Sequence, residues 1–345
     1  MSVIYIISDN GKINKVNETL EFTATDGTIR KIFPHKMDSL IIGGLVSITG
    51  AAMRLLMKHQ INTLFISSNG KYSGKLSFTG TKNIFLRKKQ YLLSDDESFA
   101  LPIAKSIVTA KLKNELTFVQ RIKRKKDSNV NFDSIVLSLK NIIDQTENAK
   151  ALDELRGYEG MGAKHYFSVF RHNLIPDWAH FPNRSKNPPK TNVNAVLSFL
   201  YALLMYRIET AIELSGLDTM AGFLHVSDYG KNALVFDMME EFRTPVVDTL
   251  CCALFNRGVL SPLDFDIVDE FDDADMGKDG EKAVLLNKDG LKKAITAFEN
   301  KIETLLFYPI LETQMSLNMI IIEQVKHLKR VIQGEEKVYK GYLYK

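Results

Sequence analysis

The chain has 345 residues, of which 45% are apolar and 25% charged, with 45 Lys and Arg against 41 Asp and Glu. These proportions are ordinary for globular proteins and exclude a collagen-like, coiled-coil or largely disordered chain. The length allows two domains or one large one, and the slight positive excess leaves the class of partner open.

Apolar runs and cysteines indicate the compartment. The N-terminal apolar run, 3–7, lacks a basic segment and a cleavage site, so it predicts a strand and not a secretion signal. The longest apolar stretches, such as 195–206, are shorter than the roughly 20 residues that a membrane span needs. Because the two cysteines, Cys251 and Cys252, are adjacent, we expect no disulfide framework and a soluble, cytoplasmic protein.

The first 80 residues alternate apolar and polar positions, which is typical of β-strands. One helix, predicted at 49–59, interrupts the strands, and residues 77–81 are predicted to be a linker. We predict strands at 3–7, 19–24, 29–33, 39–42, 63–67 and 71–76, with turns at 9–11, 26–27 and 69–70.

From about residue 83 the spacing of apolar residues becomes helical. A hairpin is predicted at 223–236, and the acid-rich stretch 264–282 has the composition of a loop. The fold class that follows is α+β: a small N-terminal β-sheet domain with one helix (1–80), then a larger all-α C-terminal domain (81–345). The predicted helices are 84–93, 98–124, 132–145, 149–172, 192–215, 237–256, 288–305 and 311–333.

Glu159 is the first candidate for chemistry, because Gly157, Gly160 and Gly162 surround it in a helical segment. Each glycine inside a helix costs about 1 kcal/mol relative to alanine. Three of them would let another backbone or a ligand approach closely, with Glu159 facing it. A solvated glutamate on a flexible helix is the simpler alternative.

The second and third candidates lie close together in the sequence. His225 follows an apolar pair after Gly216, a predicted helix end, and a lone histidine there is more often a core residue than a ligand. In FDMMEEFR, Asp237 shares a helix face with Glu240 and Glu241. Stacked carboxylates repel unless a cation lies between them, although a solvated face is the alternative.

Together these segments supply a glutamate, a histidine and a further carboxylate, which suit a hard metal ion. Such a ligand set favours Mg²⁺ or Mn²⁺, and a single imidazole shifts the preference towards Mn²⁺. The ion could activate a water or a hydroxyl and stabilise charge on a phosphodiester. No HExxH, CxxC, GxGxxG or Walker motif competes with this interpretation.

Basic residues point to nucleic acid. Residues 81–130 contain twelve Lys and Arg against five Asp and Glu, with Lys123, Arg124, Lys125 and Lys126 at a predicted helix end. Contacts of such residues with phosphates give affinity that depends on salt and not on sequence. Arg184 belongs to a second basic region. For the run from Lys123 to Lys126, the alternative is a solvated segment at the C-terminus of a helix, where positive charge is favourable.

Four motifs occur in the order found in one known family: GYEGMGAKHYF, RSKNPPKTNVNAVLSFLYALL, GLDTMAGFLH and ALVFDMMEEFRTPVVD. Over roughly residues 1–335 the chain resembles the universal CRISPR-associated adaptation endonuclease, the integrase subunit that inserts new spacers. The ordered set makes the resemblance specific, whereas any one motif alone would be weak.

The resemblance implies a divalent-metal site formed by Glu159, His225 and Glu240. Many relatives have Asp where Glu240 stands, so Asp237 is kept as an alternative ligand or as a residue that supports the ligands. The implied reaction is transesterification, in which a DNA 3′-hydroxyl attacks a phosphodiester at the border of a repeat. With water as the nucleophile, the same site would act as a nuclease.

The resemblance also implies partners. Lys164 and Arg243 would hold DNA phosphate near the metal, and Asn194 matches a family position near the site. The family works as a homodimer joined largely through the β domain, and two dimers flank a dimer of a small ferredoxin-like protein. Double-stranded DNA would be bound by the two basic regions. A stand-alone structure-selective nuclease and a non-catalytic DNA-binding scaffold remain the alternatives.

Overall fold

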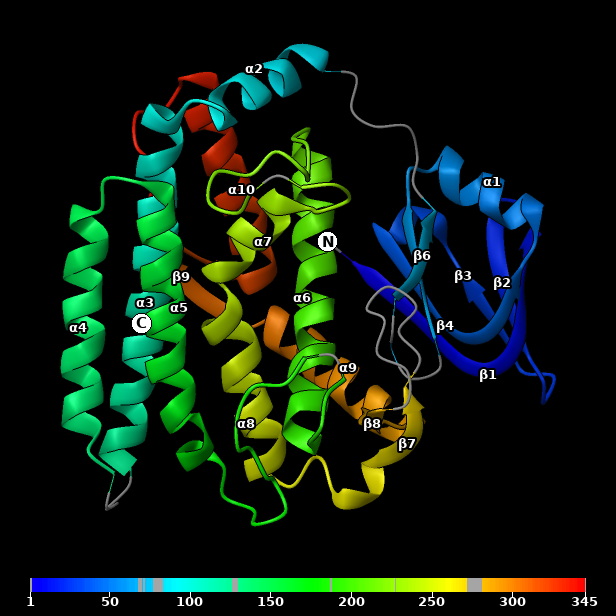
Figure 1. Cartoon of the computed structure of the whole chain (residues 1–345). Coiled ribbons are helices and arrows are strands. Elements are labelled where there is room, and N and C mark those ends of the chain that lie inside the picture. Colours follow the sequence, from blue (N-terminus) through cyan, green and yellow to red (C-terminus); the bar gives the residue numbers. More distant parts are fainter. Residues whose placement is uncertain are drawn as a thin grey trace.

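The computed structural model describes residues 2–67, 70, 72–76, 83–125, 130–186, 188–226, 228–271 and 281–344. An N-terminal β-sheet is followed by a larger, mostly helical region (Figure 1), which confirms the predicted order of the two parts. The predicted linker at 77–81 lies outside the described residues.

The N-terminal sheet has six strands in the order β3-β2-β1-β4-β5-β6. β1 pairs in parallel with β4, and β4 with β5, while the other neighbours are antiparallel. Helix α1 (Gly50–Lys58) joins β4 to β5. The strands are β1 (Val3–Val16), β2 (Thr19–Ala24), β3 (Ile29–Ile32), β4 (Ser39–Ile48), β5 (Asn62–Ile66) and β6 (Tyr72–Leu76).

The predicted turn at 9–11 is wrong, because β1 continues through it as a bulge. The pairing of β1 with β4 shifts register between Ser8 and Gly11. Opposite the bulge, Gly44 has a φ of +83°, and a Cβ there would lie 2.1 Å from the carbonyl oxygen of Ser8. Glycine lets the two strands pass each other closely, so both extend beyond their predicted ends.

The sheet has a buried core on each face. Leu40 of β4 and Leu55 of α1 belong to one core, whereas Ile41 of β4 and Leu64 of β5 belong to the core of the helical region. Alternate residues of the same strands thus face opposite cores, as the period of two predicts. The sheet is therefore packed between α1 and the helical region.

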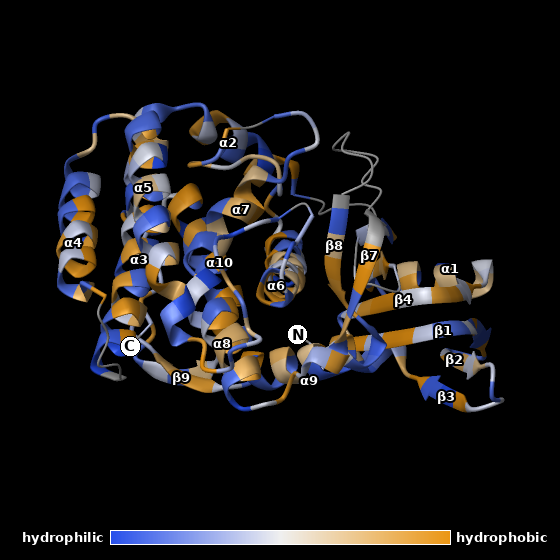
Figure 2. Ribbon diagram, turned by 60° about the horizontal axis from the view of Figure 1, so that its bottom comes forward, coloured by the Kyte–Doolittle hydropathy of each residue, from blue (hydrophilic) through white to orange (hydrophobic). Residues whose placement is uncertain are grey.

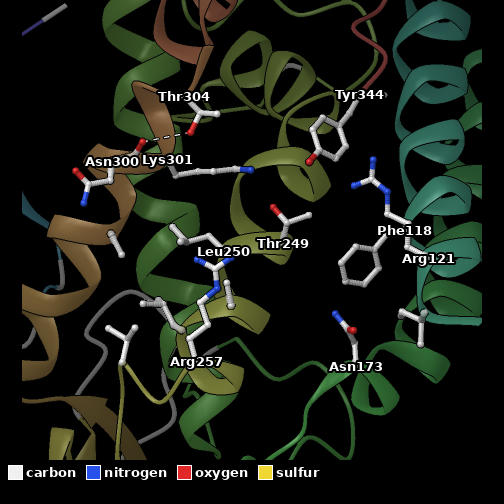
Figure 3. A pocket seen from close by; sticks show the side chains of 15 residues that line it. Phe118, Arg121, Asn173, Thr249, Leu250, Arg257, Asn300, Lys301, Thr304 and Tyr344 are labelled. Carbon is white, nitrogen blue, oxygen red and sulfur yellow. Dashed lines mark hydrogen bonds between the residues drawn. The ribbon is translucent and has the colours of Figure 1, made fainter. Parts of the chain in front are cut away.

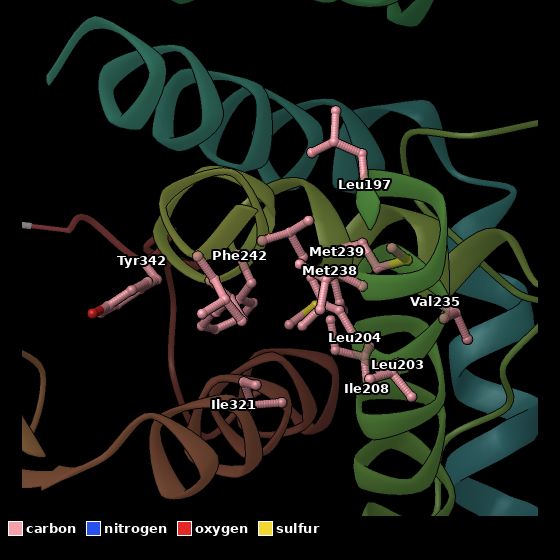
Figure 4. Close-up of a cluster of buried hydrophobic side chains, with 14 of the residues drawn as sticks. Leu197, Leu203, Leu204, Ile208, Val235, Met238, Met239, Phe242, Ile321 and Tyr342 are labelled. Carbon is pink, nitrogen blue, oxygen red and sulfur yellow. The ribbon is translucent and has the colours of Figure 1, made fainter. Parts of the chain in front are cut away.

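Nine α-helices are described in the larger region. The central helix α6 begins after the capping residue Thr191 and ends at Gly216, whose φ is +85°; both ends agree with the prediction. Its apolar side chains, such as Leu204, meet Met238 and Ile321 (Figure 4). The helices are α2 (Ile84–Ser94), α3 (Glu97–Lys125), α4 (Phe132–Asn148), α5 (Leu152–Phe170), α6 (Asn192–Ser215), α7 (Ala233–Glu240), α8 (Thr249–Asn256), α9 (Lys288–Ile302) and α10 (Leu317–Gln333).

Among the described helices, α6 alone has the length and apolar composition that could cross a membrane. Most of its apolar window, 72%, is buried inside the protein. Packing in the core therefore accounts for its apolar composition.

The prediction that the larger region is all-α is wrong. The hairpin of β7 (Phe265–Phe271) and β8 (Glu281–Leu286) occupies part of the acid-rich stretch for which a loop is predicted. This hairpin lies beside the sheet (Figure 2), and a second one joins β9 (Leu305–Tyr308) to β10 (Thr313–Ser316). The hairpin predicted at 223–236 is also wrong, because the described residues there form bends and the start of α7.

The helix predicted at 237–256 is interrupted. α7 ends at Glu240, a π-helical turn covers Arg243–Asp248, and α8 follows. Pro245 has no N–H to donate to the carbonyl of Glu241, and that carbonyl accepts from the side-chain amide of Asn114 at 3.0 Å instead. The proline therefore explains the break, which changes the direction in which the residues after Glu240 project.

Candidate active site

Glu159 of α5 and Glu240 of α7 lie on either side of the ammonium group of Lys111 from α3. Nζ of Lys111 contacts Oε1 of Glu159 and lies 2.6 Å from Oε2 of Glu240. The Lys111 side chain is only 6% exposed, so the two glutamates share a buried cation. A positive charge thus already stands between two of the three predicted metal ligands.

Glu240 is held in its charged form. Burial alone would raise its pKa, but the charges of Arg243 and Lys111, with a smaller effect of His225, lower the pKa to about 2. Nε of Arg243 donates to Oε1 of Glu240 at 2.9 Å.

The histidine is held by Asp237. Oδ1 of Asp237 accepts from the backbone N–H of His225 at 2.9 Å and from its ring Nδ1 at 2.7 Å. Oδ2 accepts from the N–H groups of Phe223 and Leu224. Since a carboxylate only accepts, Nδ1 carries a proton, and Nε2 is the ring nitrogen that is left for another partner.

α3 and α5 approach each other closely at Gly162. A Cβ on Gly162 would lie 2.1 Å from Cδ2 of Leu112, whereas Gly157 and Gly160 have nothing within 4 Å. The predicted close approach is therefore confirmed at one of the three glycines. This contact brings Lys111, the residue before Leu112, next to Glu159.

A second layer of polar groups lies behind the glutamates. The Oε2 atom of Glu115 is buried without a hydrogen-bond partner, and burial raises the pKa of Glu115 to about 8 despite the opposing charge of Lys111. Asp248 accepts from the hydroxyls of Tyr166 at 2.8 Å and Tyr201 at 2.5 Å. Burial raises the pKa of Asp248, and these hydrogen bonds oppose the rise.

The donor set fits a divalent cation. Two carboxylates already face one cation, and a carboxylate-bound imidazole is the usual form of a histidine ligand. In the part of the chain that the structure describes, however, no three His, Cys, Asp or Glu side chains converge closely enough to hold a metal ion. The Lys111 ammonium stands between the glutamates, so a metal ion bound by both would have to displace it.

Arg184 and Asn194 brace the edge of the site. Oδ1 of Asn194 accepts from Arg184 and from the N–H of Ser185, both at 3.0 Å, and Asn194 is fully buried. The guanidinium groups of Arg184 and Arg243 lie 5.5 and 5.0 Å from the ring centre of Tyr201. Asn194 thus orients the guanidinium group of Arg184, while Arg243 places positive charge beside Glu240.

The other predicted DNA contacts lie farther along the helices. Lys164 is exposed on α5, and Arg124 is exposed near the end of α3, while Lys123 pairs with Asp133. The side chain of Lys125 and the whole of Lys126 lie outside the described residues. An exposed position leaves these residues free to reach a phosphate, so their roles stay predictions.

Lys111 and Glu115 were missed as site residues, although the sequence holds a signal for them. Both occupy the apolar stripe of α3 that runs through Ala104, Val108 and Phe118 at steps of three and four residues. Charged residues within such a stripe have to be buried, and buried charges need partners. A count of charges along the sequence cannot distinguish them from surface residues.

The chain is similar to known proteins in sequence and in fold. The model of the family described as CRISPR associated protein Cas1 matches residues 4–300. The relative named CRISPR-associated endonuclease Cas1 1, from Chlorobaculum tepidum, is 27% identical over 350 residues, which cover 100% of this chain and 99% of that protein.

Two solved structures are similar in fold. A casposase bound to integration product has a TM-score of 0.81 at 23% identity, covering 99% of this chain and 93% of that one. A chain of a Cas6-RT-Cas1–Cas2 complex has a TM-score of 0.84 at 23% identity, covering 99% of this chain and 36% of that one.

Proposed function

The chain belongs to the family of CRISPR-associated Cas1 proteins, and on that premise we propose that it is a CRISPR adaptation integrase and endonuclease. It would join short DNA fragments to a CRISPR array as new spacers and would cleave DNA phosphodiesters. The observation that carries the proposal is the pair Glu159 and Glu240 around one buried cation, the ammonium group of Lys111.

Glu159, Glu240 and Nε2 of His225 would hold a divalent metal ion, Mg²⁺ or Mn²⁺. When bound, the ion would supply activation of a DNA 3′-hydroxyl or of water and neutralise charge on the phosphodiester. Asp237 would not be a ligand, because its oxygens already accept from three backbone N–H groups and the imidazole. Its part would be to orient His225 and fix the ring proton on Nδ1.

Positive side chains would orient the DNA around this site. Arg243 is pinned by Glu240 and lies against Tyr201, so its guanidinium would meet a phosphate with little loss of freedom. Arg184, braced by Asn194, would add a second contact, and Lys164 a third on α5. Lys123 to Lys126 would bind the backbone farther away.

The assembly is proposed from the same family. The chain would form a homodimer largely through its N-terminal sheet, and two dimers would flank a small ferredoxin-like partner in the cytoplasm. A solved relative of the same fold is part of a Cas6-RT-Cas1–Cas2 complex, which supports a partner of this kind.

Strand joining and strand cleavage on one labelled duplex test the proposal. Glu159→Gln and His225→Ala should each lower both activities about 100-fold or more, and should weaken Mn²⁺ binding measured by calorimetry. DNA affinity should change less than about twofold, because phosphate contacts supply most of it. Glu154→Gln, on the first turn of the same helix α5, is the matched control.

The outcomes separate the alternatives. If only cleavage is seen, even with the partner protein present, the chain is a stand-alone nuclease. If both variants keep every activity of the wild type, the chain is a DNA-binding scaffold. Loss of DNA affinity together with activity would point to misfolding, which the unfolding curves of the same samples would reveal.

A further inference from the structure

A cavity of about 610 Å³ lies away from the candidate active site, between the ends of several helices. It is lined by residues of α3, α8 and α9 and by Tyr344 near the C-terminus, and it includes none of Lys111, Glu159, His225 or Glu240. Its volume falls in the range of small-ligand sites, about 300–1,000 Å³. The proposed reaction at Glu159, His225 and Glu240 therefore does not use this cavity.

Three cations converge on this cavity, and no Asp or Glu lines it among the residues that the structure describes. Arg121, Arg257 and Lys301 reach into it from three different helices or their ends (Figure 3). No Asp or Glu is among the lining residues, and none of the described acidic side chains forms an ion pair with these three. Elsewhere in the protein, the mostly buried lysines Lys75 and Lys111 are paired with glutamates.

Two of these cations, Arg121 and Lys301, both lie near the ring of Tyr344. The pKa of Lys301 is lowered, first because the ammonium is buried and then because Arg121 is near. Burial alone would raise the pKa of Tyr344, but Arg121 and Lys301 lower it. The ring of Tyr344 lies 4.6 Å from the Arg121 guanidinium and 5.5 Å from Nζ of Lys301, so it separates the two charges.

Neutral groups complete the lining. Asn173 and Asn300 offer amides, Thr249 and Thr304 offer hydroxyls, and Phe118 offers an aromatic surface. Concentrated positive charge, hydrogen-bond groups and ring surfaces in one hollow match a molecule that carries both phosphates and a base.

We propose that this cavity binds a phosphate-bearing ligand of nucleotide size through Arg121, Arg257 and Lys301. The ligand is either a free nucleotide or the phosphorylated terminal nucleotide of a strand, which share this chemistry. A hollow of limited volume suits one nucleotide better than the extended backbone of a duplex. The site is independent of the proposed integrase function.

Calorimetric titration of the full-length protein with AMP, ATP and inorganic phosphate tests the site. We expect saturable binding that is tightest for ATP. Arg257 is exposed, so Arg257→Gln should leave the fold intact and weaken ATP binding about tenfold. Lys301→Met should weaken it likewise. Lys292→Met, on the same helix α9 but outside the cavity, is the matched control and should bind as the wild type does.

Competition with single-stranded oligonucleotides separates the two sources. If only the 5′-phosphorylated strand displaces ATP, the ligand is a strand end; if neither strand does, it is a free nucleotide. Equal displacement by phosphorylated and unphosphorylated strands, absent binding of every probe, or equal weakening by Lys292→Met and Arg257→Gln would overturn the proposal. Glu159→Gln should bind ATP like the wild type even if the integrase function fails.

Discussion

Nζ of Lys111 lies 2.6 Å from Oε2 of Glu240, and both side chains are almost completely buried. The Lys111 ammonium group is therefore a cation of the protein itself that neutralises Glu159 and Glu240. Removing one partner of a buried ion pair leaves the other charge uncompensated, which typically costs about 3–5 kcal/mol.

We expect Lys111→Met to lower the free energy of unfolding by about 3 kcal/mol in EDTA, because Glu159 and Glu240 are then left facing each other. Mn²⁺ should restore much of this stability and should stabilise the variant more than the wild type, because no Lys111 ammonium group has to be displaced. Urea unfolding with and without Mn²⁺ measures both effects.

Lys113→Met, on the same helix α3, breaks only the exposed pair with Glu147 and should cost less than about 1 kcal/mol. Equal Mn²⁺ stabilisation of wild type and Lys111→Met would contradict this role.

A second prediction concerns the contact between α3 and α5. Gly162→Ala should destabilise the protein by about 1–3 kcal/mol and reduce activity, because the new methyl group would push against Leu112 and separate Lys111 from Glu159. Gly160→Ala should be neutral or stabilising by up to about 1 kcal/mol, because nothing lies near its Cβ position. Chemical unfolding and strand-joining assays measure the two effects. Similar results for both variants would show that the helix contact is not the constraint.

The basic end of α3 gives a prediction about salt. Replacing Lys123 and Arg124 by Gln should weaken DNA binding and flatten the plot of log affinity against log salt by about 0.9 for each phosphate that is no longer neutralised. Arg124 should contribute more, because Lys123 is already paired with Asp133. Fluorescence anisotropy at several salt concentrations measures the slope. Lys31→Gln/Lys58→Gln removes the same charge from the sheet region, and an equal effect there would argue against a specific basic surface.

His327 makes the attachment of the C-terminal chain sensitive to pH. Its Nε2 accepts from the N–H of Lys340 at 2.9 Å, and Nδ1 contacts Glu336, so the ring is neutral in the folded protein. Burial lowers the pKa of His327, and Glu336 opposes this only in part. The folded state therefore binds fewer protons than the unfolded state, and the stabilisation is complete above the unfolded pKa of about 6.5 and declines as pH falls.

The comparison of wild type with His327→Gln isolates this effect. The amide oxygen of Gln can still accept from Lys340, but it does not titrate. We expect the difference in free energy of unfolding between the two proteins to shift in favour of the variant as the pH falls from about 7.5 to about 5. A difference that stays constant over this range would rule out His327 as the titrating group.

Local signals in the sequence predicted much of the fold. The helical spacing over 192–215 and the glycine at Gly216 located both ends of α6, and the period of two located the strands of the sheet. The break after Glu240 was missed because the apolar spacing continues across the π-helical turn. Pro245 is the signal in the sequence that could have predicted it. The hairpin of β7 and β8 was missed because β7 lies in the acid-rich stretch, whose composition is that of a loop. The hairpin of β9 and β10 was missed because its strands have four residues each and lie between two helices.

The candidate site was predicted in part. Glu159 and Glu240 were named, and they lie around one cation, but no motif in the sequence indicated that Lys111 lies between them. Asp237 was retained as an alternative metal ligand, because sequence spacing alone cannot show which hydrogen bonds a carboxylate accepts. Its partners come from the backbone of a bend that only the folded chain forms.

That bend has a practical consequence for anyone screening variants. Phe223, Leu224 and His225 all wrap around the single carboxylate of Asp237, so its removal would release the whole turn and let the imidazole swing away. An inactive Asp237→Ala protein would then look the same in an assay as one lacking a coordinating group. Inactivity at this position is therefore no proof of coordination, and a metal-binding isotherm recorded with Asp237→Asn is the safer guide.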